Sequence, residues 1–185
     1  TMDFKDQIKV LAERVIKLKE NLQTEEATKT ALIMPFIQAL GYDIFDPTEV
    51  IPEYTCDLGI KKGEKIDYAI CQDNAPIILV ECKHWKENLD AHNSQLFRYF
   101  HVSKARFGIL TNGIIYRFYT DLVEKNKMDE KPFFEFNMEQ YRSSQVEKLK
   151  EFHKSYFNVD TILNTASELK YTNEIRNAIA KEAQE

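Results

Sequence analysis

The chain lacks any apolar run long enough to cross a membrane. Its uninterrupted apolar stretches are short, such as Pro76 to Val80, whereas a membrane-spanning helix needs about 20 apolar residues. No secretory signal peptide is visible either. We therefore expect an intracellular, cytoplasmic protein that has no membrane partner.

Cysteine is scarce, and its spacing excludes the common cysteine-based frameworks. The three cysteines, Cys56, Cys71 and Cys82, form no CxxC pair and leave one residue over. This spacing is typical of reduced thiols in a cytoplasm rather than of disulfides. The four histidines show no close metal-ligand spacing, so we do not expect a structural zinc site.

A surplus of basic residues is also missing. The chain has 25 lysines and arginines against 30 acidic residues, which gives a formal net charge of −5. A protein that binds nucleic acid by itself usually carries a positive net charge, because it must neutralise phosphates. If nucleic acid is the substrate, we expect another domain or subunit to supply much of the binding.

The sequence has no phosphate-binding loop for ATP. Its nearest approach runs from Gly108 to Gly113, but Ile114 follows where such a loop has lysine, and the segment lies between two predicted strands. We therefore expect no ATP site in this chain.

What is present is the composition of a single globular domain. The 185 residues are 43% hydrophobic, 30% charged and 12% aromatic, which is enough to bury an ordinary enzyme core. We predict one domain over residues 1–185. It divides into an N-terminal helix at 1–24, a core at 25–136 and a C-terminal helical extension at 137–185.

Two amphipathic helices open the chain. Apolar residues recur at helical spacing from Phe4 to Leu22. A second helical pattern follows Thr24, a residue type that caps helix N-termini, and stops at Gly41. Pro35 lies inside this second pattern and is expected to kink the helix or to mark a local break.

Period-two patterns and turn residues then predict five strands. A helix at 91–103 separates the third strand from the fourth, and Asn112-Gly113 is a strong hairpin turn between the last two. Two further helices follow from Met138, separated near residues 158–160. The fold class is therefore α/β, with a mixed central sheet, a meander plus further strands, flanked by helices. The predicted strands lie at 49–55, 65–71, 76–83, 107–111 and 114–120.

Two acidic residues and a lysine stand in the second and third strands. If residues 73–75 form a three-residue loop, Asp67 falls directly opposite Glu81, with Cβ atoms about 5 Å apart. Lys83 points to the same side because strand side chains alternate. The apolar run at 77–80 leads straight into Glu81 and is typical of a strand covered on both faces, where charges are costly without a partner.

Carboxylates that face each other repel, so this pair favours a cation between them. Hard oxygen ligands suit Mg²⁺ or Mn²⁺ better than zinc. Such an ion polarises a phosphoryl oxygen and lowers the pKa of a bound water, while a nearby lysine orients or deprotonates the attacking water. The pattern therefore favours phosphodiester hydrolysis, although a Glu-x-Lys tripeptide on an exposed strand is usually only a solvated pair.

Five segments follow one another in an order and spacing that resemble a known family. They read TEEATKTALIMPFIQALGYD, EYTCDLGIKKGEKIDYAI, IILVECKHW, QLFRYF and GILTNGIIYRFYTD. Together they resemble the N-terminal nuclease domain of type I restriction enzyme R (motor) subunits, within the PD-(D/E)xK superfamily. The resemblance covers roughly Glu25 to Tyr119 and extends into Phe133 to Phe136, and it implies a restriction-endonuclease-like core.

The resemblance implies roles for the strand residues. Asp67 and Glu81 would be metal ligands, with the main-chain carbonyl of Cys82 as a third, and Lys83 would be the catalytic lysine. Ile66 stands where the family has a proline, a change that affects the strand more than the chemistry. The implied cofactor is Mg²⁺, with Mn²⁺ as a substitute.

The resemblance also implies an acidic residue on the second helix. Glu25 is the candidate, because Glu25, Lys29 and Leu32 lie along one helical face. Glu26 is a close alternative. Without the resemblance, either glutamate is equally well explained as a favourable charge at a helix N-terminus.

A QxxxY motif of these subunits matches Gln95 and Tyr99. At positions i and i+4 the two side chains share one helix face. The resemblance implies that they bind substrate, through a phosphate or the water shell of the metal. By pattern alone they are ordinary residues at the edge of the core.

We therefore predict a Mg²⁺-dependent endonuclease that acts on double-stranded DNA. The alternative is a non-catalytic module that binds nucleic acid or protein on the same fold, and no residue separates DNA from RNA as the substrate. An R subunit couples this domain to an ATP-driven motor, which 185 residues cannot hold. The chain would be either a stand-alone relative or part of a longer chain, working with motor, specificity or modification subunits.

Overall fold

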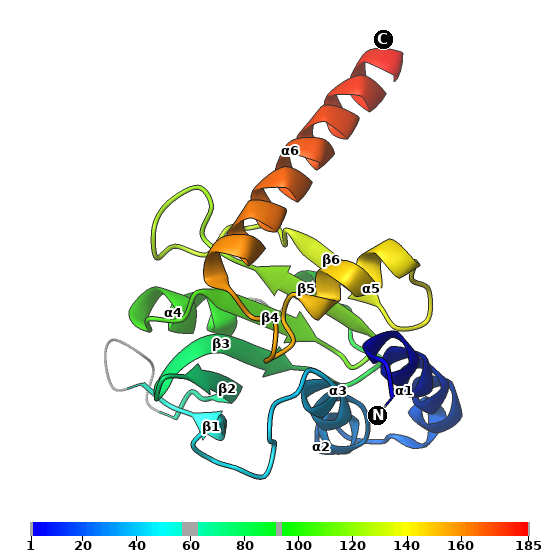
Figure 1. The fold of residues 1–185 in the computed structure, drawn as a ribbon, viewed down its shortest axis with the longest axis vertical. Helices are drawn as coiled ribbons and strands as arrows, with labels where there is room; N and C mark the ends of the chain where they lie inside the picture. Colours follow the sequence, from blue (N-terminus) through cyan, green and yellow to red (C-terminus); the bar gives the residue numbers. More distant parts are fainter. Residues whose placement is uncertain (1, 57–62, 92–93, 185) are drawn as a thin grey trace.

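One mixed sheet of six strands forms the centre of the molecule (Figure 1). The computed structural model describes residues 2–56, 63–91 and 94–184. The strands lie side by side in sequence order, and every neighbouring pair is antiparallel except β3 and β4, which are parallel. They are β1 (Val50–Tyr54), β2 (Ile66–Gln72), β3 (Ala75–Cys82), β4 (Phe107–Thr111), β5 (Ile115–Tyr119) and β6 (Phe134–Asn137).

Helices cover both faces of the sheet, which confirms the predicted fold class. Parallel strands need a crossover connection, and the segment between β3 and β4 contains helix α4 (Ser94–Val102). This helix packs against β3, β4 and β2. Leu96, Tyr99 and Phe100 of α4 belong to the hydrophobic cluster on that face. The larger cluster on the opposite face joins the sheet to the N-terminal helices and to α5 (Ser143–Lys150).

The first helix is part of the larger cluster rather than an appendage to it. Helix α1 spans Phe4–Leu18, and the 3₁₀ turn η1 (Lys19–Asn21) follows it. Phe4, Ile8 and Val15 are buried at helical spacing, so the predicted packing role of this amphipathic pattern is confirmed.

The second predicted helix is continuous but contains a wide turn. It consists of α2 (Glu25–Thr28), the π-helical turn η2 (Lys29–Ile33) and α3 (Met34–Ala39). Thr24 caps it, since its hydroxyl accepts a 3.0 Å hydrogen bond from the amide of Ala27. The π turn ends two residues before Pro35, so the local break predicted at this proline takes the form of a single widened turn.

The missing amide of Pro35 leaves a carbonyl without its helical donor. Pro35 has no N–H to give to the carbonyl of Ala31, four residues earlier. Nε of Arg14, on α1, donates to that carbonyl oxygen at 2.7 Å. A side chain of α1 therefore stabilises the widened turn of the neighbouring helix.

The β2–β3 hairpin corrects one detail of the sequence prediction. Its turn has two residues, Asp73 and Asn74, with φ of 53° and 63°, and Gln72 pairs with Ala75. The predicted three-residue loop is therefore wrong. The ladder shifts by one residue between Cys71 and Ile70, however, so Tyr68 pairs with Val80. The predicted three-residue loop would have given this same pairing.

The β4–β5 hairpin has the predicted Asn112-Gly113 turn. The side chain of Asn112 accepts hydrogen bonds from the amides of Ile114 and Ile115. Gly113 has a φ of +83°, and a Cβ there would lie 3.0 Å from side-chain atoms of Leu32. The sequence patterns predict no strand at β6, which adds a sixth strand to the five predicted ones.

The C-terminal extension comprises two helices, as predicted. After α5, helix α6 (Val159–Gln184) projects from the body of the molecule (Figure 1). Its buried residues, Ile162 and Ala166, lie near its start. Across the described part of the chain, no helix combines the length and the apolar character needed to cross a membrane.

Candidate active site

The predicted acidic residues meet where β3 ends, beside β2 and the start of α2. In the β2–β3 ladder Tyr68 pairs with Val80, so the next step along it brings Asp67 opposite Glu81. Both side chains leave the sheet toward the same face because residues directly opposite each other on paired strands share a face. The structure therefore brings together the two carboxylates that the sequence predicts to be partners.

Glu81 is a buried acid, with 4% of its surface exposed. Its Oε1 lies 3.8 Å from Nζ of Lys83. Its Oε2 is buried and receives no hydrogen bond from any donor within residues 2–56, 63–91 and 94–184. Burial raises the pKa of Glu81 to about 8, with the charge of Asp67 as the second cause and Lys83 opposing it.

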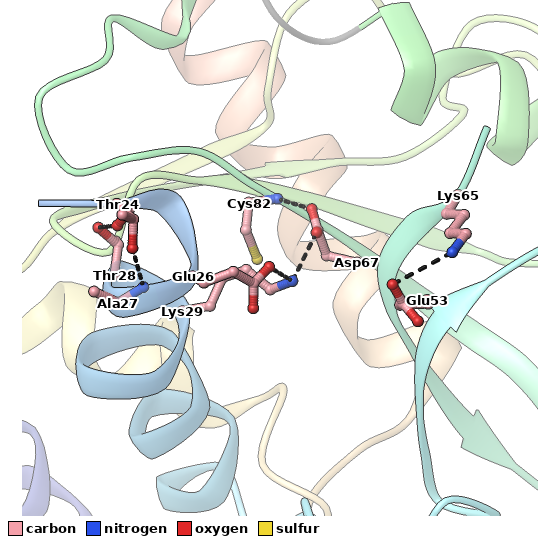
Figure 2. Close-up of polar contacts among 9 residues, drawn as sticks. All are labelled: Thr24, Glu26, Ala27, Thr28, Lys29, Glu53, Lys65, Asp67 and Cys82. Atoms are coloured by element: carbon pink, nitrogen blue, oxygen red, sulfur yellow. Dashed lines mark hydrogen bonds and ion pairs between the residues drawn. The ribbon is translucent and has the colours of Figure 1, made fainter. Parts of the chain in front are cut away.

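Asp67 has a partner on each of its carboxylate oxygens (Figure 2). Oδ2 accepts a 2.7 Å hydrogen bond from the main-chain amide of Cys82. Oδ1 lies 3.1 Å from Nζ of Lys29. These two contacts come from different elements, a strand and a helix, so they fix the orientation of the carboxylate.

Lys29 is the residue that sequence reasoning missed. Its Nζ bridges two acids, at 2.9 Å from Oε1 of Glu26 and 3.1 Å from Oδ1 of Asp67 (Figure 2), and it lies over the ring of Tyr68, 5.3 Å from the centroid. Burial lowers its pKa, but the bonds to Glu26 and Asp67 outweigh burial and raise it. The sequence does contain an indication of this role, because Lys29 lies one helical turn after Glu25 within an otherwise apolar helical pattern.

The two helix glutamates have different surroundings. Glu26 pairs with Lys29, and its side chain is 78% exposed. Glu25 is close enough to the strand residues to respond to their charges: partial burial and Asp67 raise its pKa, whereas Lys83 and Lys29 lower it. The placement therefore agrees with Glu25 as the candidate that faces Asp67 and Lys83.

A set of polar contacts holds the start of α2 against the end of β3. The carbonyl of Leu22 accepts from Nε2 of His84 at 2.8 Å and from Nε1 of Trp85 at 3.0 Å. The amide of Trp85 donates to Oγ1 of Thr28 at 3.3 Å. These residues directly follow Lys83, so the contacts place the helix glutamates beside the strand acids.

Gln95 and Tyr99 share one face of α4, as predicted, and both contact the segment that leads into β2. The amide of Gln95 donates to the carbonyl of Lys65, and the hydroxyl of Tyr99 donates to the carbonyl of Glu64. The polar atoms of the motif therefore hold the main chain two and three residues before Asp67.

The donors at this site suit a hard divalent ion. Asp67 and Glu81 supply carboxylate oxygens, and the Oε2 of Glu81 has free acceptor capacity. The amide of Cys82 points at Asp67, and its carbonyl lies on the same side of the strand because both groups of an extended residue do. No group of three or more His, Cys, Asp or Glu side chains with metal-binding geometry occurs among the described residues, so a full ligand set would include this carbonyl or water.

Comparison with known proteins adds one decisive finding. A family model described as the N terminus of type I restriction enzyme R proteins (HSDR_N) matches residues 24–132. The chain belongs to this family. The match begins at the helix cap Thr24 and includes every candidate site residue, from Glu25 to Tyr99. No curated protein and no solved structure matches the chain significantly. Membership of the R-protein N-terminal family agrees with the expected resemblance and with a role in a larger restriction complex.

Proposed function

We propose that this R-protein N-terminal domain is a Mg²⁺-dependent DNA endonuclease of the PD-(D/E)xK type. The observation that carries the proposal is the buried carboxylate of Glu81, opposite Asp67, with an oxygen that no described donor satisfies. A buried acidic oxygen that no donor satisfies is costly, so its retention in a buried strand favours a functional role.

The residues have distinct proposed roles. Asp67, Glu81 and the carbonyl of Cys82 would hold the ion, with Glu25 nearby. When bound, Mg²⁺ supplies charge stabilisation for the phosphoryl group and a bound water of lowered pKa. The ammonium of Lys83, 3.8 Å from Glu81, would orient the attacking water and offset the negative charge that develops in the transition state.

DNA binding is proposed to be shared with partners. The net charge of −5 gives the chain little electrostatic attraction for phosphates on its own. Motor, specificity or modification subunits, or a further domain, would supply the rest. Gln95 and Tyr99 are proposed substrate contacts near the start of β2, in addition to the main-chain contacts that they make with Glu64 and Lys65.

Nicking of supercoiled plasmid DNA in Mg²⁺ or Mn²⁺ tests the proposal. Asp67→Ala and Lys83→Ala should each reduce cleavage at least ~100-fold, the usual scale for a lost electrostatic contributor, with unchanged circular dichroism. Lys86→Ala is the matched control, because Lys86 is exposed and its ammonium lies over the Trp85 ring. Cleavage by both site variants at the wild-type rate would refute the assignment.

The acidic net charge also favours a second candidate, a non-catalytic binding module on the same fold. Calorimetric titration with Mn²⁺ separates the two proposals. A folded chain that takes up no Mn²⁺, with Asp67→Ala behaving identically, would favour the binding module.

A further inference from the structure

A cation already lies between Asp67 and Glu26, one of the two helix glutamates. Nζ of Lys29 lies 3.1 Å from Oδ1 of Asp67 and 2.9 Å from Oε1 of Glu26. A positive charge within hydrogen-bonding distance of two carboxylates is the arrangement that a bridging metal ion would otherwise provide.

Lys29 is built into this position. Only 9% of its side chain is exposed, and its ammonium lies over the ring of Tyr68. The side chain leaves the helix at the first residue of the π turn η2, which Arg14 and Pro35 help to define. To withdraw the ammonium, its methylene stem would have to leave the core.

Glu81, the strand neighbour of Asp67, has no cation at hydrogen-bonding distance among the described residues. Its Oε2 receives no hydrogen bond from a described donor. The ammonium of Lys83 pairs with the other oxygen, Oε1, at a longer distance of 3.8 Å. The two neighbours of Asp67 therefore differ: a fixed ammonium lies between Asp67 and Glu26, whereas Glu81 has an oxygen with free acceptor capacity.

We propose that this site binds a single divalent ion, on the Glu81 side, and that the ammonium of Lys29 takes the place of a second ion between Asp67 and Glu26. The inference rests on the proposed metal-dependent function and specifies its metal stoichiometry. In two-metal sites the ions lie roughly 3.5–4 Å apart. A second ion bridging the two acids that Lys29 bridges would meet that ammonium at close range, where like charges repel.

Manganese binding counts the ions directly. The full chain, stripped of metal with chelator, is titrated with Mn²⁺, and free Mn²⁺ is followed by electron paramagnetic resonance. Wild type should bind one Mn²⁺ per chain. Lys29→Met, which keeps the length of the stem and removes the charge, should bind two, and the bound ions should show the spin–spin broadening of neighbouring Mn²⁺.

Two controls define the origin of the second ion. Lys154→Met removes a lysine that pairs with Glu49 at 2.7 Å, away from the strand acids, and should still bind one Mn²⁺. Adding Glu26→Gln to Lys29→Met should abolish the second ion. If Lys29→Met does not fold, Lys29→Gln replaces it, and the wild-type count remains decisive.

The outcomes separate this inference from the proposed function. Two ions in the wild type would overturn the single-ion inference and leave the proposed nuclease intact. One ion in both the wild type and the folded Lys29 variant would overturn the role of Lys29. No bound ion in the folded wild type would overturn the metal-dependent function itself, and the inference with it.

Discussion

Replacement of Glu81 by glutamine should stabilise the metal-free protein at neutral pH. Glu81 is buried, and its pKa is raised to about 8, so at pH 7 the folded chain holds a proton that the unfolded chain has lost. A protonated Glu81 can donate a hydrogen bond to Asp67. Glutamine has the same shape and a permanent N–H donor, so Glu81→Gln reproduces the protonated acid at every pH.

The size of the effect follows from the two pKa values. The raised folded-state pKa gives stability that is fully present below the unfolded-state value of 4.5 and lost as the pH rises toward 8. At 1.36 kcal/mol per pKa unit, the wild type loses ~3 kcal/mol between pH 4.5 and pH 7 through this group. The glutamine variant does not, so its advantage should grow from near zero at pH 4 to ~3 kcal/mol at pH 7.

Thermal unfolding in chelator, at several pH values, measures this difference. For a chain of this size, ~3 kcal/mol corresponds to a gain in Tm of roughly 6–12 °C at pH 7. Glu130→Gln is the control, because Glu130 is exposed, and its Tm should follow the wild type at every pH. A Glu81→Gln variant whose Tm difference from the wild type is the same at pH 4 and pH 7 would show that Glu81 is not a buried, protonated acid.

Three further predictions address the helix acid, the QxxxY helix and the widened turn. Glu25→Gln should reduce plasmid nicking more than 10-fold, and Glu26→Gln should reduce it less. Equal losses in the two variants would contradict the placement of Glu25 beside Asp67. Tyr99→Phe should cost ~1 kcal/mol in urea unfolding, because the carbonyl of Glu64 loses its donor, and no change would mean that water replaces the phenol. Arg14→Met should cost ~1–2 kcal/mol, measured in the same way, since the carbonyl left without an N–H by Pro35 also loses the guanidinium.

The sequence predicts the pairing of Asp67 with Glu81, but through a loop of the wrong length. Residues 77–80 are an uninterrupted apolar run, so alternation does not specify the register, and the prediction depended on the assumed loop length. The pairing is nevertheless right, because a shift in the ladder between the turn and the acids compensates for the shorter loop. Here Cys71 pairs with Pro76 and Ile70 with Ile78, so the bulge absorbs one residue.

Lys29 and β6 show what local patterns leave out. A lysine in an amphipathic helix is ordinarily on the solvated face. Lys29 is a buried ion-pair partner because it lies in the π turn and because Asp67, 38 residues later in the sequence, folds back next to it. Strand β6 has four residues, Phe134–Asn137, which is too short for a convincing period-two signal. Its pairing with β5 is a tertiary contact, and such contacts override local propensity.

The hydrophobic core extends past both borders of the recognisable family segment, residues 24–132. Phe4 and Ile8 at one flank, and Leu149 and Phe152 at the other, are interior residues of the same cluster as Phe36. A polypeptide truncated to residues 24–132 would expose the apolar surface that these flanking residues cover. We expect it to aggregate even though it retains every acid and lysine of the site. Homology thus marks where the chemistry is encoded, whereas the smallest self-sufficient folding unit is larger.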